Sequence, residues 1–531
     1  MKIQRLQLNK IEYYKNKYNI SSLCAKVLDA MQLHDDMIDD VLLNNRTLYD
    51  IDDTLLEPII HRIKKAKDNN EKVLICGDYD CDGICATTIL YDALLKYGLD
   101  VGYYIPNRFT QGYGLHIDTV HMAYEKGYSL LITVDNGVKA CDALTQAKQY
   151  KMDIILTDHH AYEDNELICD YFLHPNILPN YYEKMCGAAM AFLIAKALIG
   201  LYENHIILCG IATIGDVMPM LKFNRVIVKE CIRLLKLGKY SFIQLLANDH
   251  NEWDEKKIAF QIVPKLNSVG RLADRANVNN MIKFLLCEDI NQIPILVDQL
   301  NKLNDMRKNL SLSMEKRAKS KMVGDTNFII LYDENFYEGL NGIVASHLAN
   351  KMQKSVMVLS ENNSILKGSI RSYGIDLTSF FDEIKHELIS YGGHKDAAGI
   401  AFEKNKLNII ENYVNQKISD KIEEIELKVI EVDKDEITIE NLQSLSILKP
   451  FGQEFELPLF LIKDENIKVS KLGNGSHLKY QGNEFTYLYF NHGERYTQDI
   501  YKDSLTFIGT FEINVFRNKK SINMIVEYID E

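Results

Sequence analysis

The segment from Val73 to Gly83 constrains the fold of this chain more than any other, because it joins a buried strand to a helix through a run of carboxylates. Apolar residues 73–76 predict the strand, and Asp78, Asp80 and Asp82 follow on alternate positions. A helical pattern covers residues 84–97 and ends before a glycine. In open α/β sheets, ligands bind at the carboxyl ends of the strands, where this turn is expected to lie.

The three carboxylates favour a site for hard divalent cations. Neighbouring carboxylates repel one another strongly in a low-dielectric environment. Mg²⁺ and Mn²⁺ prefer oxygen ligands and relieve that repulsion. A solvated acidic loop after a strand is the alternative, and the rest of the chain makes it less favourable.

Length and composition indicate a globular protein of several domains. A chain of 531 residues exceeds what one hydrophobic core serves, so two to four domains are expected. Residues 1–20 have no apolar core segment, and the apolar run 186–201 is broken by Lys196, so we expect neither a signal peptide nor a membrane span. These features predict a cytoplasmic protein.

Cysteines and charge exclude some classes of function. None of the ten cysteines forms a CxxC pair, which argues against zinc and redox motifs and favours buried thiols. The net charge of −13 argues against a surface that is basic throughout. A local basic groove for a nucleic acid remains compatible with it.

Hydrophobic periodicity divides the chain into five predicted parts: a helix-prone lead-in at 1–50, an α/β lobe at 51–220, a helical connector at 221–323, a second α/β lobe at 324–419 and a strand-rich tail at 420–531. Alternation of strands and helices in the first lobe predicts a parallel, doubly wound sheet with strands at 73–76, 101–105, 130–134 and 153–156. The connector is predicted to be irregular at 263–272 and to end in a long helix over 290–322 that joins the two lobes.

Strands are also predicted in the other two sheets. The second lobe has candidates at 328–332, 356–359, 366–370 and 399–402, with glycine pairs between some of them. The tail has short candidates at 427–432, 459–462, 478–480, 485–490, 505–508 and 524–528. Short alternating strands of this kind are typical of a small β-barrel or sandwich.

Other residues of the types that bind metals follow further apolar segments of the first lobe. Asp135 follows the strand at 130–134, and His159 and His160 follow the strand at 153–156. Asp216 follows another apolar run, which we interpret as a fourth strand end. The candidate ligands are therefore Asp78, Asp80, Asp82, Asp135, His159 and Asp216. Such a set can hold two cations about 3.5–4 Å apart, the arrangement that promotes phosphoryl transfer.

These segments resemble the motifs of a known superfamily. Four of them are similar to the motifs of the DHH phosphoesterases: Gly77-Asp-Tyr-Asp-Cys-Asp-Gly83, Val134-Asp-Asn-Gly137, Thr157-Asp-His-His160 and Gly215-Asp216. Others resemble the RecJ-type exonuclease branch: Ile105-Pro-Asn-Arg-Phe109, Gly112-Tyr-Gly114, Cys186-Gly-Ala-Ala189, Pro264-Lys-Leu-Asn267 and Gly270-Arg271. In the second lobe, Gly342-Ile-Val-Ala-Ser346, Gly368-Ser-Ile-Arg-Ser372 and Gly392-Gly-His394 resemble the DHH-associated domain, and Pro450-Phe-Gly452 resembles the lead into an OB-like domain.

The resemblance implies a fold and an activity. The fold is α/β, with a DHH phosphoesterase domain and a DHH-associated domain joined by a long helix, plus a C-terminal OB-like β-barrel. The activity is 5′→3′ digestion of single-stranded DNA to 5′-mononucleotides with two Mn²⁺ or Mg²⁺ ions, in DNA repair or recombination. A helicase or a single-strand-binding protein is an implied partner. The alternatives are a phosphodiesterase for short oligonucleotides or cyclic dinucleotides, a manganese pyrophosphatase, and an inactive scaffold.

The resemblance also implies residue roles. Asp80, Asp82, Asp135, His159 and Asp216 match metal ligands, with Asp82 and Asp135 central to catalysis, and Asp78 and His160 match residues beside them, His160 near the scissile phosphate. Arg108, Arg271, Ser369 and Arg371 match binders of the 5′ phosphate or terminal nucleotides, and His394 matches a residue facing the cleft. The chain departs from the pattern at Cys76, at Lys265, where arginine is usual, and at Tyr337 and His347, where histidine and arginine are expected.

Overall fold

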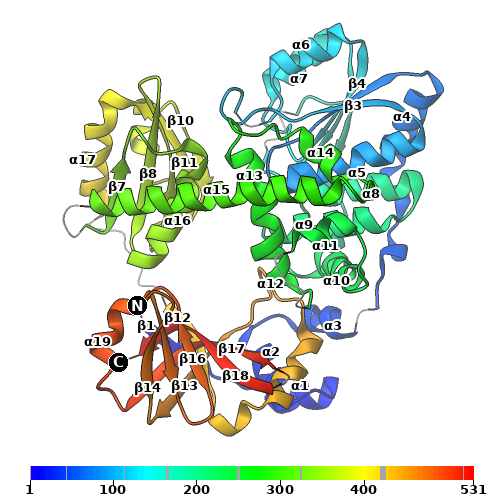
Figure 1. Cartoon of the computed structure of the whole chain (residues 1–531). Coiled ribbons are helices and arrows are strands. Elements are labelled where there is room, and N and C mark those ends of the chain that lie inside the picture. The colour runs from blue at the N-terminus through cyan, green and yellow to red at the C-terminus, as the bar shows by residue number, and fades with distance from the viewer. Residues whose placement is uncertain are drawn as a thin grey trace.

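The computed structural model describes residues 2–43, 45–112, 114–162, 167–247, 252–322, 326–418, 426–517 and 519–530. They form three sheets and the helices around them (Figure 1). No helix in these ranges combines the length and apolar character that a membrane span needs.

The sheet of the first lobe is parallel and has the order β3-β2-β4-β5-β6, which confirms the predicted doubly wound fold. Its strands are β2 (Lys72–Cys76), β3 (Asp100–Tyr104), β4 (Tyr128–Val134), β5 (Asp153–Thr157) and β6 (Tyr171–Leu173). Apolar side chains of β2 point alternately to a core with α5 (Cys81–Tyr97) and α8 (Gly187–Ile199) and to a core with α6 (Ile117–Glu125) and α7 (Cys141–Gln149). Burial on both faces explains the continuous apolar runs of these strands. The three-residue β6 is too short to leave a pattern.

The connector is helical and lies under the first lobe. It follows α9 (Glu203–Gly215) of the first lobe. Its elements are α10 (Lys222–Lys236), α11 (Ser241–Leu246), α12 (Glu255–Lys257), the π-helical η6 (Ile258–Ile262), α13 (Val263–Arg271) and α14 (Asn280–Leu285). The prediction of an irregular stretch at 263–272 is therefore wrong. Pro264 lies in the first turn of α13, where no intrahelical N–H bond is needed.

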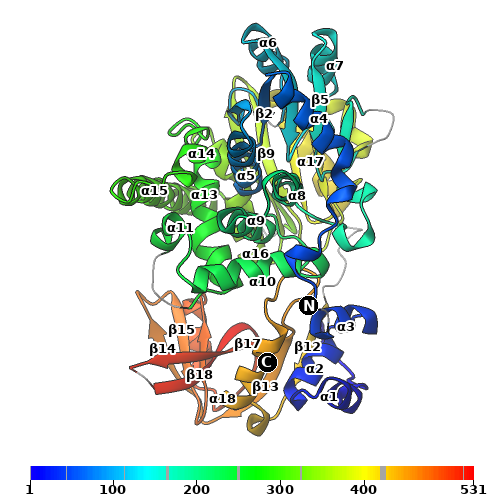
Figure 2. The ribbon, with the colours of Figure 1, turned by 90° about the vertical axis from the view of Figure 1, so that its right-hand side faces the viewer.

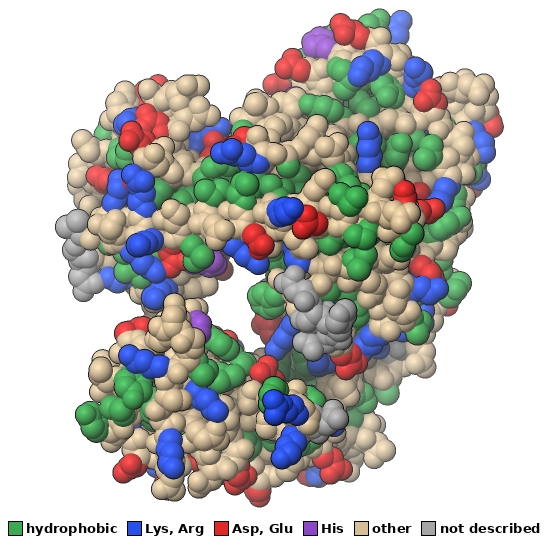
Figure 3. Space-filling view, in the orientation of Figure 1, with side chains coloured by type: hydrophobic (Ala, Val, Ile, Leu, Met, Phe, Trp, Pro, Cys, Tyr) green, Lys and Arg blue, Asp and Glu red, His purple; other side chains and the backbone are tan. Residues whose placement is uncertain are grey.

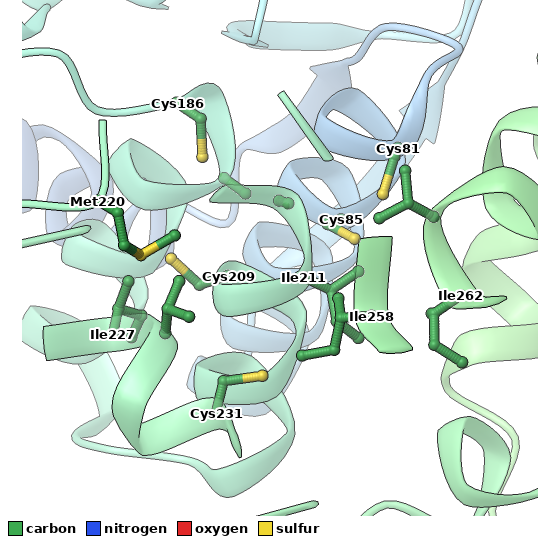
Figure 4. Packing of buried hydrophobic residues seen from close by; sticks show 14 of the residues in the cluster. Cys81, Cys85, Cys186, Cys209, Ile211, Met220, Ile227, Cys231, Ile258 and Ile262 are labelled. Atoms are coloured by element: carbon green, nitrogen blue, oxygen red, sulfur yellow. The ribbon is translucent and has the colours of Figure 1, made fainter. Parts of the chain in front are cut away.

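Buried cysteines fill the space between the connector helices and α5. Figure 4 shows Cys81, Cys85, Cys186, Cys209 and Cys231 among isoleucine side chains. All five are free thiols, and burial contributes to raising the pKa of each of them. They behave here as small apolar side chains.

The long helix α15 (Ile293–Ser320) runs from the connector to the second lobe, as predicted (Figure 1). The sheet of that lobe has the order β10-β11-β9-β8-β7 and is flanked by α16 (Asn341–Met352) and α17 (Leu407–Lys417). Its strands are β7 (Phe328–Tyr332), β8 (Ser355–Asn362), β9 (Ile365–Arg371), β10 (Ser390–His394) and β11 (Ala397–Glu403). Strand β10 was not predicted, because its glycine pair suggested a turn. In the structure, Gly392 and Gly393 pair with Gly399 and Ala398 of β11.

The third sheet joins the two ends of the chain. Its order is β1-β12-β13-β17-β18-β16-β15-β14, and β1 (Lys2–Arg5) pairs in parallel with β12 (Glu426–Glu431). The other strands are β13 (Leu459–Glu465), β14 (Lys468–Leu472), β15 (His477–Gln481), β16 (Thr486–Tyr489), β17 (Ser504–Phe516) and β18 (Lys519–Asp530). The lead-in helices α1 (Ile11–Tyr18), α2 (Ser22–Ala30) and α3 (Asp35–Leu43) lie beside this sheet (Figure 2). The OB-like strands are present. Among the described strands, however, β1 and β14 at the two ends of the order each pair with one neighbour and not with each other, so the sheet is open where a closed barrel was expected. The five domain bounds remain a prediction.

A buried arginine ties the connector to the C-terminal domain. Arg225 of α10 donates from Nη1 to the carbonyl oxygen of Pro450 at 2.7 Å and from Nη2 to those of Leu448 and Lys449 at 2.8 and 2.9 Å. Burial lowers its pKa to about 10. A buried guanidinium group of the connector thus binds the C-terminal domain through three hydrogen bonds.

Replacing Arg225 with alanine is expected to lower the free energy of unfolding by roughly 3 kcal/mol, because three carbonyl oxygens, two of them buried, lose their donor at about 1 kcal/mol each. Chemical denaturation followed by circular dichroism measures the change. Arg233→Ala on the same helix is the matched control, since Arg233 is exposed and pairs with Glu230 one turn away. A denaturation midpoint of Arg225→Ala equal to that of the control would contradict the prediction.

Candidate metal centre and arginine cluster

The acidic turn is built by the junction of β2 and α5. Asp80 is the N-cap of α5, and its Oδ1 accepts hydrogen bonds from the backbone N–H groups of Asp82 at 3.0 Å and Gly83 at 3.1 Å. A Cβ on Gly83 would lie 2.4 Å from the carbonyl oxygen of Asp78, so only glycine allows this close turn. Asp82 lies in the first turn of α5, whereas the sequence pattern predicted a helix that begins only at residue 84.

A second helix holds the carboxylate of Asp82. Asp82 Oδ2 accepts a hydrogen bond from the backbone N–H of Gly187 at 2.6 Å, and Asp82 Oδ1 accepts one from that of Ala188 at 2.8 Å, both at the N-terminus of α8. Gly187 also lies against Asp135, whose Cβ would be 2.4 Å from an added Cβ. The Cys186-Gly-Ala-Ala189 segment thus brings a helix N-terminus, where negative charge is stabilised, directly onto the acidic cluster.

His159 lies at the centre of three carboxylates from different elements. Its Nε2 is 3.1 Å from Asp135 Oδ1, 3.5 Å from Asp216 Oδ2 and 3.8 Å from Asp82 Oδ2. Asp135 follows β4 with a left-handed φ of 61°. Asp216 follows helix α9, so the expectation that it ends a strand is wrong, although the structure does bring it to the site.

The cluster offers three overlapping sets of ligand atoms, each set within 4.8 Å: Asp78, Asp80 and Asp135; Asp82, His159 and Asp216; Asp135, His159 and His160. All six candidate ligands and His160 are therefore in one place. Asp135 and His159 are shared between sets, so two neighbouring cations could have common ligands.

The electrostatics of the cluster fit cations. Burial and the charges of neighbouring aspartates raise the pKa of Asp78, Asp80, Asp135 and Asp216, which means that the ionised carboxylates are destabilised without a counter-charge. Asp78 Oδ1 and Asp216 Oδ2 are buried and have no hydrogen-bond partner among the described residues. Burial lowers the pKa of His159, which favours the neutral imidazole that binds metals. The residues present therefore fit a divalent metal centre.

His160 is held beside this centre by Asp158. Asp158 Oδ1 lies 2.7 Å from His160 Nδ1 and accepts from the backbone N–H groups of His159 and His160 at 2.7 and 3.1 Å. Burial lowers the pKa of His160, but the hydrogen bond and charge of Asp158, together with Asp80 and Asp82, raise it overall. His160 can therefore keep a proton next to the carboxylates.

Arginines from both lobes lie opposite the carboxylates. Arg271 ends α13, and burial together with the charges of Arg108 and Arg307 lowers its pKa to about 10. The guanidinium of Arg108 lies 5.2 Å from the ring centre of Tyr79, inside the acidic turn. Arg371 ends β9, donates from Nε to Ser346 Oγ at 3.0 Å, and has a pKa lowered by burial. We refer to Arg108, Arg271, Arg307 and Arg371 as the arginine cluster.

The remaining predicted residues differ in their placement. Ser369 lies beside Arg371, since an added Cβ at Gly342 would be 3.4 Å from Ser369 Oγ and 3.1 Å from Arg371 Nη2. His394 is exposed on β10, and β11 lies between it and the strand that carries Arg371. Ser369 therefore belongs with the arginine cluster, whereas His394 lies at the edge of the second sheet.

The departures from the family pattern also have definite places. Lys265 is buried and donates to the carbonyl oxygen of Leu246, which puts its ammonium inside the connector. His347 is exposed, with Nδ1 3.7 Å from Glu315 Oε2 on α15. Residue 113 of the Gly112-Tyr-Gly114 segment lies outside the described residues.

Arg307 is the member of the cluster that was not predicted from the sequence. It projects from α15, its Nε donates to Asn304 Oδ1 at 3.0 Å, and burial lowers its pKa. Its only sequence signal is a position within a long amphipathic helix, which does not distinguish it from a surface residue. Its place in the cluster depends on the packing of α15 against α13.

Three family models match successive segments of the chain, in the order of the domains described above. Residues 72–214 match the DHH family N-terminal domain, residues 325–420 the DHHA1 domain and residues 430–528 the RecJ OB domain. The matches define a DHH-family protein with a DHHA1 domain and a RecJ-specific C-terminal domain.

Curated relatives specify the branch, and a solved structure agrees with it in fold. The single-stranded-DNA-specific exonuclease RecJ of Bacillus subtilis is 31% identical over 493 residues, covering 88% of this chain and 62% of that protein. The Haemophilus influenzae protein of the same name is 27% identical, covering 92% of each. The structure of RecJ from Thermus thermophilus in complex with Mn²⁺ has the same fold, with a TM-score of 0.86, 23% identity and coverage of 100% of this chain and 79% of that one. The chain belongs to the RecJ family.

Proposed function

We propose that this chain is a metal-dependent 5′→3′ exonuclease that degrades single-stranded DNA to 5′-mononucleotides. The observation that carries the proposal is the position of the arginine cluster directly opposite the carboxylate–histidine cluster. The helix α13 that ends in Arg271 packs on the acidic turn: Asn267 Oδ1 accepts from the N–H of Cys81 at 2.8 Å, and a Cβ at Gly270 would lie 2.3 Å from the carbonyl oxygen of Tyr79. An end-specific hydrolase needs donors such as these arginines to hold the terminal phosphate while the next phosphate lies over the carboxylates.

Two Mn²⁺ or Mg²⁺ ions would be held by Asp78, Asp80, Asp82, Asp135, His159 and Asp216. When bound, such ions lower the pKa of a coordinated water and polarise the phosphoryl oxygen. The solved structures of RecJ in complex with Mn²⁺ and with Mg²⁺ support this choice of ions.

The chain's own groups would orient the substrate. His160, held by Asp158, would donate its proton to a phosphate oxygen, and Arg108, Arg271, Arg371 and Ser369 would hold the terminal 5′ phosphate. Guanidinium groups suit this role because they bind phosphate with two parallel hydrogen bonds.

An opening separates α15 and the second lobe from the C-terminal domain, and Lys and Arg side chains lie at its edge (Figure 3). We infer that the single strand reaches the site through this opening and that the OB-like domain binds its 3′ portion, as such domains commonly bind single strands. A helicase or a single-strand-binding protein stays a predicted partner that supplies this strand, and the cytoplasmic location stays a prediction.

The test is a panel of substrates incubated with Mn²⁺: 3′-labelled single-stranded DNA, blunt duplex DNA and RNA, and a cyclic dinucleotide whose hydrolysis is followed by chromatography. We expect rapid loss of the single strand from its 5′ end and little loss of the duplex. Preferential hydrolysis of the cyclic dinucleotide would favour the small-substrate phosphodiesterase instead. Equal digestion of duplex and single strand would contradict the proposal.

A further inference from the structure

The two lobes touch directly at one edge of the arginine cluster. The ring of Tyr337, before α16, packs edge-on against Phe109 of the first lobe, with ring centres 5.5 Å apart and an interplanar angle of 88°. The hydroxyl of Tyr337 donates to Asp274 Oδ1, after α13. We call the contact formed by Phe109, Asp274, Tyr337 and Gly339 the seam.

The seam is tightly closed where it reaches the arginines. A Cβ at Gly339 would lie 2.0 Å from the carbonyl oxygen of Arg271 and 3.2 Å from Phe109 Cζ. Arg271 Nη1 is also 3.4 Å from the carbonyl oxygen of Gly339. Backbone of the second lobe therefore lies directly against the connector, and no nucleotide fits between Gly339 and Arg271.

Tyr337 contributes a contact that the family pattern does not predict. The resemblance led us to expect histidine at this position, with a role in terminal-phosphate binding. In the structure the longer tyrosine side chain instead spans from the second lobe to Phe109 and Asp274. Tyr337 therefore contributes an aromatic ring that packs on Phe109 and one hydroxyl that donates to Asp274.

We propose that the seam is an end stop that makes the site specific for a free 5′ end. This inference rests on the proposed function. A strand cut at an internal position must continue on both sides of the reacting phosphate, and the seam closes the side beyond the arginine cluster. Only a terminal nucleotide then fits between the arginines and the carboxylates.

The reaction itself is unchanged by the seam. Water adds to phosphorus, the P–O3′ bond of the terminal nucleotide breaks, and the departing 3′ oxygen takes a proton. The terminal nucleotide leaves with its own 5′ phosphate, and the shortened strand keeps the attacked phosphate as its new 5′ end. That new phosphate can then advance to the arginine cluster for the next cycle.

The test removes side chains from either side of the seam and measures whether the protein gains the ability to cut DNA without a free 5′ end. Tyr337→Ala and Phe109→Ala remove its two aromatic rings, whereas Tyr337→Phe keeps the ring and loses only the hydrogen bond to Asp274. Tyr501→Ala, at an 88% exposed tyrosine of the C-terminal domain, is the matched control. Each protein is incubated with Mn²⁺ and linear 5′-phosphorylated, 5′-fluorescein-blocked or circular single-stranded DNA.

We expect the wild type, Tyr337→Phe and Tyr501→Ala to digest linear phosphorylated DNA and to cut circular and blocked DNA only at a low background rate. Either alanine variant of the seam should cut circular and blocked DNA about tenfold faster than the wild type, a difference of about 1.4 kcal/mol in barrier. Failure of the wild type on linear DNA would refute the proposed function. If the wild type digests linear DNA but neither seam variant cuts circular or blocked DNA faster than the wild type, the end-stop inference alone is overturned. This holds whether the variants keep or lose activity on linear DNA.

Discussion

Replacing Asp216 with alanine is expected to abolish measurable exonuclease activity and to leave the metal-free protein at least as stable as the wild type. Asp216 Oδ2 is buried without a hydrogen-bond partner among the described residues, 3.5 Å from His159 Nε2. Burial and the charges of Asp82 and Asp80 raise its pKa, so its carboxylate has no stabilising role until a cation is bound. Loss of a ligand that supports the attacking water should lower kcat by about three orders of magnitude, or about 4 kcal/mol.

Asp82→Ala provides the contrast that separates metal binding from folding. It should lose activity to the same degree, but its carboxylate also accepts two backbone hydrogen bonds from the N-terminus of α8. Loss of such a helix cap typically costs about 1–2 kcal/mol. Thermal unfolding in EDTA should therefore show a lower melting temperature for Asp82→Ala and not for Asp216→Ala.

Thermal unfolding with added Mn²⁺ completes this comparison. The wild type should be stabilised by the ion, because binding to the folded state raises its stability, and both variants should show a smaller shift. Near wild-type turnover of Asp216→Ala at saturating Mn²⁺ would remove Asp216 from the metal centre.

The first sheet and most of the metal site could be predicted because they depend on local patterns. A parallel strand covered on both faces is a continuous apolar run, and a residue directly after it must lie at the carboxyl edge of the sheet. Asp78, Asp135 and His159 follow this rule. Asp216 does not, because the apolar run before it is the buried helix α9, and a short apolar run by itself does not distinguish a buried helix from a strand.

Features that depend on distant contacts left no pattern to find. Arg307 joins the arginine cluster because α15 packs against α13, and β1 joins β12 from the opposite end of the chain. The double role of Asp82, as ligand candidate and as cap of α8, likewise needs the approach of Gly187. Each case requires knowledge of which elements are neighbours, and periodicity does not supply it.

Arg371→Ala is expected to slow digestion of 5′-phosphorylated single strands by roughly two orders of magnitude, because a charged donor to phosphate is typically worth a few kcal/mol. Arg371 is held by Ser346 Oγ and by the carbonyl oxygen of Ile370 at 2.9 Å, so its guanidinium is fixed before substrate arrives. The loss should be smaller on 5′-hydroxyl DNA, which lacks the dianionic terminal group. Initial rates on both substrates, each labelled at the 3′ end, measure the change in preference and the direction of shortening.

Two further variants distinguish a phosphate contact from a general loss of positive charge. Arg371→Lys keeps the charge but lacks the planar fork, so it should recover only part of the rate. Arg317→Ala is the matched control on α15, since Arg317 pairs with Asp333 at 2.7 Å and Lys321 remains 2.8 Å from the same carboxylate. Its rates should equal those of the wild type on both substrates. A wild type without preference for the 5′ phosphate, whose products shorten from the 3′ end, would disprove the assigned polarity, because a pocket for the terminal phosphate can select only the end that carries it.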